Sequence, residues 1–227
     1  MFKSLETKAP SRDALLIGLG KLKNAALFLL LPVILVLIGV SIIITGLLTG
    51  RSLAVITAGI ATVLIVVFLG LLLKLIAVYG YLIPAYSSFR EYDPAKFETP
   101  AKLVKIGYVA GLLMMIIGVA LMETGALSKT PASLMTGIAI TIIGTIFHII
   151  GFIGLIIGIF RLKELTNEGK FEIAGIFFIL GLFIAILQLI GWVLTYLGAK
   201  NAINKLSQTP IDKSTVATET EETPPIP

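Results

Sequence analysis

His148 is the only histidine in the chain, and it lies within a long apolar stretch that contains no acidic or basic residue. A titratable side chain inside a membrane span is a functional-site hypothesis by default, because its charged form is costly to bury. His148 could bind a ligand or carry a proton, but the apolar stretches supply no Asp or Glu to relay that proton. A neutral histidine that hydrogen-bonds a carbonyl or a threonine is the structural alternative, and we favour it.

Three other polar side chains, Gln188, Thr141 and Thr145, lie in similarly apolar surroundings. If the segments that hold them fold back on each other, Gln188 comes near both threonines and His148 comes near residues 181–184. Polar side chains of this kind commonly hydrogen-bond across membrane helices. We therefore predict one intramembrane polar site made of His148, Gln188, Thr141 and Thr145, in which Gln188 mainly joins two helices.

Other chemistry has little support in the sequence. The chain has no cysteine and a single histidine, which excludes Cys-ligated and multi-His metal sites within one chain. No serine has a recognisable base, no pair of membrane carboxylates is available for acid and base work, and no glycine-rich phosphate loop occurs. We expect no enzyme activity, no cofactor and no metal.

The composition predicts an integral membrane protein. Of the 227 residues, 57% are hydrophobic and only 14% are charged, and the mean hydropathy is +1.03. Soluble domains have about 45–50% apolar and about 25% charged residues. A helix needs about 20 apolar residues to cross a bilayer. Five segments without Asp, Glu, Lys or Arg qualify or come close: 25–48, 53–73, 106–122, 134–160 and 173–197.

We therefore predict an all-α, polytopic transmembrane helical bundle with five spans over residues 25–199. Residues 1–24 form a basic cytoplasmic segment, in which residues 11–23 are either an amphipathic helix on the membrane surface or an extension of the first span. Residues 200–227 are rich in Thr, Pro and Glu, and we expect a disordered tail.

The distribution of Lys and Arg predicts the orientation. Twelve of them precede the first span or lie in the loops before the third and fifth spans, whereas five lie on the opposite side. The positive-inside rule then places the N-terminus in the cytoplasm of a cell (plasma) membrane protein and the C-terminus outside. Lys74 is assigned to neither side, and we expect it to snorkel to the inner interface; a lysine on an ion pathway is the alternative. The basic residues favour anionic lipid headgroups as partners and not nucleic acid.

Regularly spaced glycines predict close helix packing. Gly137, Gly144, Gly151 and Gly158 recur every seven residues, and small residues recur similarly in segment 173–197. We expect these two segments to pack along a seam of small residues. Gly107 and Gly111 have the spacing of a helix-contact motif, which would serve either within the bundle or between protomers, as in a homo-oligomer or a membrane complex.

Two loops resemble each other. Phe89-Arg90 precedes Lys96-Phe97-Glu98, and Phe160-Arg161 precedes Lys170-Phe171-Glu172. The second and third spans therefore look like a tandem duplicate of the fourth and fifth. Both loops would then face the same side of the membrane, as the charge distribution also requires.

A further motif points to a family. The run Tyr92-Asp93-Pro94-Ala95-Lys96-Phe97, followed by Lys105-Ile106-Gly107 and preceded by Gly20-Lys21-Leu22-Lys23, resembles an archaeal family of multi-pass membrane proteins whose domain has no known function. The resemblance implies an archaeal plasma membrane and no particular activity. Our first functional hypothesis is a scaffold or accessory subunit. The alternative is a small transporter or channel subunit that uses the seam between the fourth and fifth spans. A polar cavity around His148 would favour this alternative, whereas a dry, closely packed seam would favour the scaffold.

Overall fold

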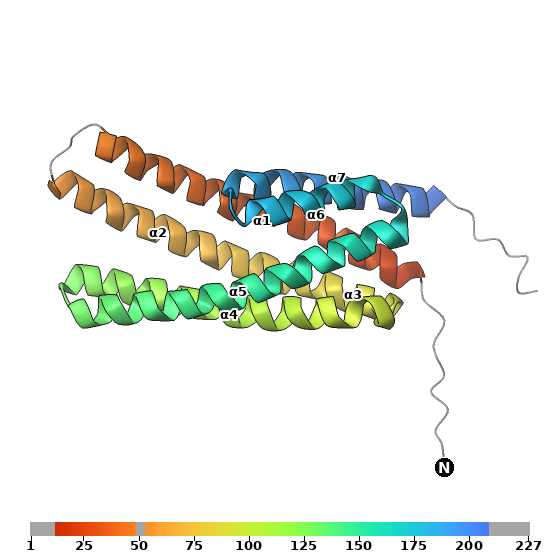
Figure 1. Ribbon diagram of the computed structural model, residues 1–227, viewed down its shortest axis with the longest axis horizontal. Coiled ribbons are helices and arrows are strands. Elements are labelled where there is room, and N and C mark those ends of the chain that lie inside the picture. Colours follow the sequence, from red (N-terminus) through yellow and green to blue (C-terminus); the bar gives the residue numbers. More distant parts are fainter. Residues whose placement is uncertain (1–11, 49–52, 209–227) are drawn as a thin grey trace, which may run out of the picture.

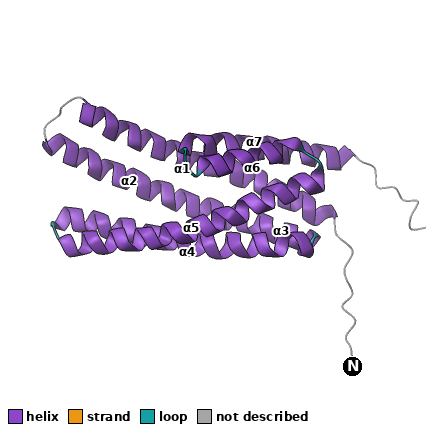
Figure 2. Ribbon diagram, in the orientation of Figure 1, coloured by secondary structure: helices purple, strands orange, loops and turns teal. Residues whose placement is uncertain are grey.

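The computed structural model describes residues 12–48 and 53–208, and this part of the chain is helical without any strand (Figure 2). Five helices are long and apolar enough to cross a membrane. The predicted all-helical class and number of long apolar helices are confirmed, whereas the predicted tail after Gln208 lies outside the described residues. In chain order the elements are α1 (Arg12–Leu48), α2 (Leu53–Ala77), η1 (Val78–Leu82), α3 (Ile83–Tyr92), α4 (Pro94–Ser128), α5 (Pro131–Thr166), α6 (Gly169–Gly181) and α7 (Ala185–Gln208).

The first helix is continuous from Arg12, so the basic segment extends the first span and is not a separate surface helix. Leu15, Leu19 and Leu22 are almost fully buried in the protein core. They are therefore unavailable for insertion into lipid. The apolar face predicted to meet the membrane is instead covered by the protein's own helices, α1 packing against α3 and α7.

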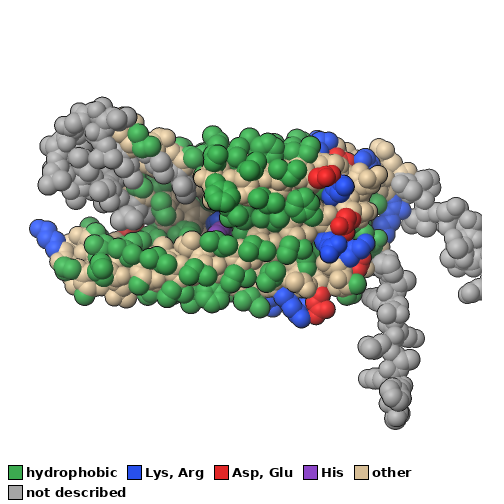
Figure 3. Space-filling view, viewed as in Figure 1, with side chains coloured by type: hydrophobic (Ala, Val, Ile, Leu, Met, Phe, Trp, Pro, Cys, Tyr) green, Lys and Arg blue, Asp and Glu red, His purple; other side chains and the backbone are tan. Residues whose placement is uncertain are grey.

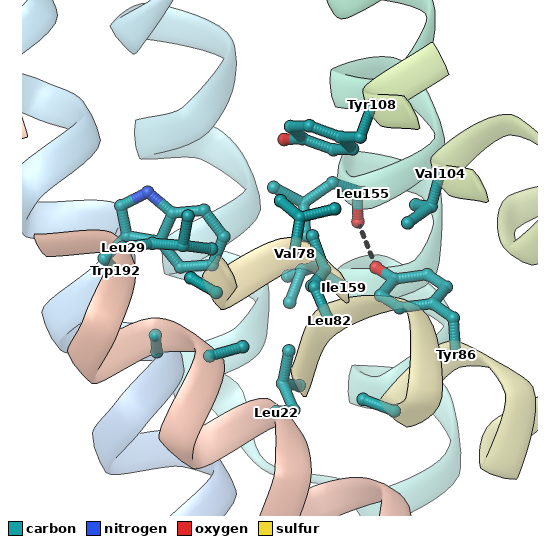
Figure 4. Close-up of a cluster of buried hydrophobic side chains, with 14 of the residues drawn as sticks. Leu22, Leu29, Val78, Leu82, Tyr86, Val104, Tyr108, Leu155, Ile159 and Trp192 are labelled. Atoms are coloured by element: carbon teal, nitrogen blue, oxygen red, sulfur yellow. Dashed lines mark hydrogen bonds between the residues drawn. The ribbon is translucent and has the colours of Figure 1, made fainter. Parts of the chain in front are cut away.

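The second span is longer than predicted because α2 continues through η1, a π-helix, into α3 without a loop. A π-turn shifts the register of the residues that follow it and occurs often at functional sites. Here Val78, Leu82 and Tyr86 reach the core, and the Tyr86 hydroxyl donates a hydrogen bond of 2.8 Å to the Leu155 carbonyl (Figure 4). Lys74 consequently lies inside this long helix and not near its end.

Helices α4 and α5 form a hairpin and lie side by side from the loop that joins them as far as Gly154, after which α5 turns away toward α6 (Figure 1). Their backbones approach so closely that a Cβ atom on Gly111 would stand 2.6 Å from the His148 nitrogen, and one on Gly144 would stand 2.9 Å from the Met115 nitrogen. Gly107 likewise meets the backbone of Gly151. The seam of small residues therefore joins the third and fourth predicted spans, and our prediction that it joins the fourth and fifth is wrong.

The predicted fifth span, 173–197, is not one continuous helix. It breaks between Gly181 and Ala185, and α6 and α7 fold back on each other as an antiparallel hairpin. Gly191 faces the Phe178 ring across this hairpin, and Gly198 faces Phe171. With 13 residues, α6 is about 20 Å long, whereas the hydrocarbon core of a bilayer is about 30 Å thick.

The hairpin returns the chain to the end of the bundle where α1 begins (Figure 1). Arg12 and Gln208 therefore lie at the same end of the bundle, whereas five complete crossings would have placed them at opposite ends. The break at the hairpin tip is the physical reason, because one continuous fifth span would have crossed to the other end.

The two similar loops, around Asp93 and Glu168, lie at this same end of the bundle (Figure 1). The helices that follow them differ, however, because α4 has 35 residues and α6 has 13. Tandem duplication stays a prediction from the sequence.

Candidate functional site

Lys74 and His148 meet in the interior of the bundle, where Lys74 Nζ lies 2.9 Å from His148 Nε2. Lys74 lies well inside the apolar segment Ile65–Tyr92, and His148 occupies the middle of α5. This position overturns our expectation that Lys74 snorkels to the membrane surface. Two half-buried basic side chains, and not one, therefore meet halfway along the bundle.

Tyr108, from α4, packs against both side chains. Its ring stands edge-on to the His148 ring, with 4.8 Å between the ring centroids, and Lys74 Nζ lies 5.9 Å from the Tyr108 centroid. An aromatic ring at this distance attracts a cation through its quadrupole. Because Tyr108 is almost fully buried, it also fixes the orientation of the imidazole.

The glycine seam determines where His148 stands. Gly111 brings α4 against the backbone of His148, so the imidazole sits beside Tyr108 of the neighbouring turn. Lys74 approaches from the other side on α2, which also packs against α4. The pair is therefore assembled by three helices, two of which are held together by backbone contact.

The hydrogen bonding of this pair is incomplete. His148 Nδ1 is buried and has no hydrogen-bond partner among the described residues. None of the ion pairs found within residues 12–48 and 53–208 includes Lys74. Buried polar groups in proteins are nearly always paired, so each exception calls for an explanation.

A cavity of about 180 Å³ adjoins Lys74. In the space-filling view, the histidine is visible at the bottom of a hollow between two layers of helices (Figure 3). Most of the cavity wall is apolar, and Lys74 and Gln188 are its polar members. The lining residues are Pro32, Val33, Val67, Gly70, Leu71, Lys74, Met115, Ala185 and Gln188.

The tip of the α6–α7 hairpin forms one wall of this cavity. Ala185 begins α7, and Gln188 follows one turn later. The Gln188 amide donates to the Gly181 carbonyl at 3.2 Å and so closes the turn between the two helices. The hairpin thus ends beside Lys74, about halfway along the bundle (Figure 1).

The structure separates the four residues predicted to form one polar site. His148 and Gln188 lie near Lys74, as described above. The Thr141 hydroxyl instead donates to the Gly137 carbonyl within its own helix, beside Gly118, and the exposed Thr145 donates to the Thr141 carbonyl. Both hydroxyls are satisfied by local bonds that are common for threonine in helices.

Sequence reasoning singled out Lys74 but favoured the wrong position for it, although a signal for an interior position was present. Lys74 is the only charged residue between Arg51 and Arg90. We ended the span at residue 73 because we treated a lysine as a boundary. An isolated charge inside a long apolar run can equally mark an interior site.

A second polar cluster holds the open end of the hairpin. Glu168, in the turn between α5 and α6, accepts hydrogen bonds from Lys205 at 2.7 Å, Lys170 at 3.2 Å and Asn201 at 3.4 Å. Burial raises the pKa of the Glu168 carboxyl, but the hydrogen bonds and charges of Lys205 and Lys170 outweigh it, so the pKa lies below its usual value. This cluster ties α7 to the α5–α6 turn.

Within the described ranges, no group of three His, Cys, Asp or Glu side chains could hold a metal ion. A comparison with curated proteins and one with solved structures each gave no match. A family model does match residues 16–227, which include the whole of the site. The chain therefore belongs to the family described as "Protein of unknown function (DUF973)".

Proposed function

We propose that the protein is a small membrane transporter or channel subunit whose ion or substrate site is the cavity at Lys74 and His148. The observation that carries this proposal is the 2.9 Å contact between these two groups, halfway along an apolar bundle and beside a cavity. A lysine at membrane depth is costly unless function requires it. Half-length helices that meet at the membrane midplane are a common way for transporters to build such sites.

This proposal replaces a scaffold or accessory subunit as our first hypothesis. The glycine seam, which would have been an attractive surface for a partner, is used inside the chain by α4 and α5. A cavity lined by Lys74 and Gln188, beside the contact between Lys74 and His148, supports the transporter alternative.

We also propose four membrane-crossing segments and one re-entrant hairpin, with both ends of the described chain in the cytoplasm. Among the described residues, every Lys and Arg except Lys74 and Lys129 belongs to the end of the bundle that holds Arg12 and Gln208 (Figure 3). The positive-inside rule favours that end as the cytoplasmic one. Its basic side chains would meet anionic lipid headgroups there.

Flux measurements test the proposal. The full chain is reconstituted into liposomes, and the fluxes of protons, potassium and chloride are each measured under an imposed gradient. We expect one flux above that of empty liposomes, and we expect Lys74→Met to reduce it at least tenfold. Lys105→Met is the matched control, because Lys105 is exposed on α4 and does not line the cavity. Equal fluxes for the wild type and Lys74→Met, or no flux at all, would refute the proposal.

A further inference from the structure

The polar groups around the Lys74 cavity are mainly hydrogen-bond donors. A lysine ammonium has three donors and no acceptor. When Lys74 carries its charge, it must donate to His148 Nε2, which then has no proton of its own. The neutral imidazole therefore carries its proton on Nδ1, and that N–H is the buried atom without a partner.

Gln188 adds a further donor at the cavity wall. Its side-chain nitrogen donates one hydrogen to the Gly181 carbonyl, and the amide has a second hydrogen that this bond does not use. The ammonium of Lys74 likewise has two hydrogens beyond the one that faces His148. The cavity therefore offers donors from two elements, α2 and α7.

Within residues 12–48 and 53–208, no carboxylate forms an ion pair with Lys74. The chain has no Asp or Glu between Asp13 and Glu91, and none between Glu123 and Glu164, so α2 and the central part of α5 supply none. The facing titratable groups are His148 on α5 and Tyr108 on α4. A buried ion without a counter-ion is strongly disfavoured, so an occupant that brings negative charge would be favoured.

Size and charge restrict the occupant further. A cavity of about 180 Å³ has room for a small ion. One ammonium compensates one negative charge. The remaining wall, formed by side chains such as Val67, Leu71 and Met115, is apolar and favours an ion that loses its hydration shell easily.

We infer that this cavity binds a small monovalent anion, held by the Lys74 ammonium with the help of His148 and Gln188. The inference rests on the proposed function for its location and adds the class of ion. Lys74 supplies the charge that balances the anion. His148 acts as a positioning residue, because its Nε2 accepts one ammonium hydrogen and leaves the other two to face the cavity.

Chloride binding by the full chain in lipid nanodiscs tests the inference without requiring transport. The probe is chloride, and its binding is followed by the broadening of its NMR line as it exchanges with the protein. We expect saturable broadening that formate displaces at a concentration within tenfold of that of chloride, whereas sulfate does not displace it. Lys74→Met should abolish the broadening, while Lys105→Met should leave it unchanged.

Four more variants, two at Lys74 and two at His148, keep the test decisive if Lys74→Met fails to fold. Lys74→Arg retains the charge and should still bind chloride, whereas Lys74→Gln should not. His148→Gln retains an acceptor for Lys74, and we expect it to weaken binding less than His148→Leu does. Equal broadening in the wild type and both uncharged Lys74 variants, or none in the wild type, would overturn the inference.

The two proposals can fail separately. A flux that depends on Lys74, without any chloride or formate binding, would overturn the anion inference and leave the transport proposal standing. Chloride binding that depends on Lys74, without any measurable flux, would support the anion site and refute transport.

Discussion

At the residue scale, the central feature is a lysine that contacts a histidine and no carboxylate. A buried charged group contributes little to stability unless it is fully paired, and its removal often leaves a protein as stable or more stable. Lys74 is therefore better explained by binding than by folding. Residues at functional sites commonly reduce stability in this way.

We predict that Lys74→Met raises the free energy of unfolding, or leaves it unchanged within error, while it abolishes activity. The expected gain is as much as about 1–4 kcal/mol, the range seen when buried ionic groups are replaced by apolar ones. Unfolding in mixed detergent micelles, followed by circular dichroism, measures it. Leu71→Ala, on the same helix and in the cavity wall, is the contrasting variant and should lower stability, because it removes buried apolar atoms. A loss of stability in Lys74→Met as large as that in Leu71→Ala would contradict this view.

At the element scale, two hairpins with different construction flank the site. The α4–α5 hairpin is held by glycines that let two backbones touch, so it forms a stiff wall that carries Tyr108 and His148. The α6–α7 hairpin instead packs aromatic rings such as Phe178 and Trp192, whose centroids lie 4.8 Å apart. Its open end is fastened by Glu168.

For the first hairpin, we predict that Gly144→Ala lowers the free energy of unfolding by about 1–3 kcal/mol, the usual cost of overpacking. The added Cβ would stand 2.9 Å from the Met115 backbone nitrogen, so the helices must separate. Gly20→Ala is the matched control, because a Cβ there meets nothing within 4 Å. It should raise stability by about 0.5–1 kcal/mol, the helix preference of Ala over Gly. Similar effects of the two substitutions in the same unfolding assay would count against the seam.

For the second hairpin, we predict that acid loosens α7. The pKa of Glu168 is lower in the folded protein than in the unfolded chain, so its stabilising effect is complete above its ordinary pKa and is lost as the pH falls through the lowered value. Hydrogen exchange of α7 amides, measured over this acidic range, should accelerate in the wild type. In Glu168→Gln the exchange should already be faster near neutral pH, and it should respond less to acid.

The size of this effect follows from the hydrogen bonds that are lost. Bonds to a charged group contribute about 1.5–3 kcal/mol each where they are well shielded from water. Lys205 and Lys170 are partly exposed, so we expect the lower end of that range for Glu168→Gln. Glu164→Gln, at an exposed carboxylate near the end of α5, is the control and should change little. Identical pH dependence of exchange in the wild type and Glu168→Gln would show that this cluster does not hold the hairpin.

At the scale of the whole molecule, the α6–α7 hairpin determines the topology that we propose. It brings both ends of the described chain to one end of the bundle, where nearly all the described basic residues also lie (Figure 3). The exposed tip residues Leu182, Phe183 and Ile184 are apolar, as a re-entrant hairpin that ends in lipid requires. The charge distribution therefore agrees better with the folded chain than with five simple crossings.

Site-directed labelling checks this topology. The chain has no cysteine, so each single-Cys variant reports one position only. We predict that Cys at Glu164 and at Ser207 reacts with a membrane-impermeant maleimide only after the membrane is permeabilised, whereas Cys at Thr130 reacts in intact cells. Cys at Ile146, exposed on the lipid side of α5, is the unreactive control. Labelling of Ser207 from outside in intact cells would restore a fifth crossing and refute the re-entrant hairpin.

The sequence by itself determined the class of the protein and the presence of five long apolar helices, because the hydrophobicity and length of a segment are local properties. It also identified His148, as the only histidine, and the small residues of α4 and α5, because glycines at regular helical spacing can be recognised in the sequence alone. The partner of each helix could not be read in this way. Gly144 has the same spacing whether it faces α4 or α7, so the seam was assigned to the wrong neighbour.

Only the tertiary structure decided which residues form the site. Lys74 and His148 are 74 positions apart, and they meet because the π-helix extends the second span while Gly111 holds α5 against α4. The break in the helix after Gly181 could not be predicted from the sequence either, because residues 173–197 are apolar enough to cross a membrane as one helix. Pairing between α6 and α7, including the bond from Gln188 to Gly181, stabilises the turn instead. Hydrophobicity limits where a helix can lie, but side-chain contacts between distant segments decide where it turns and what it meets.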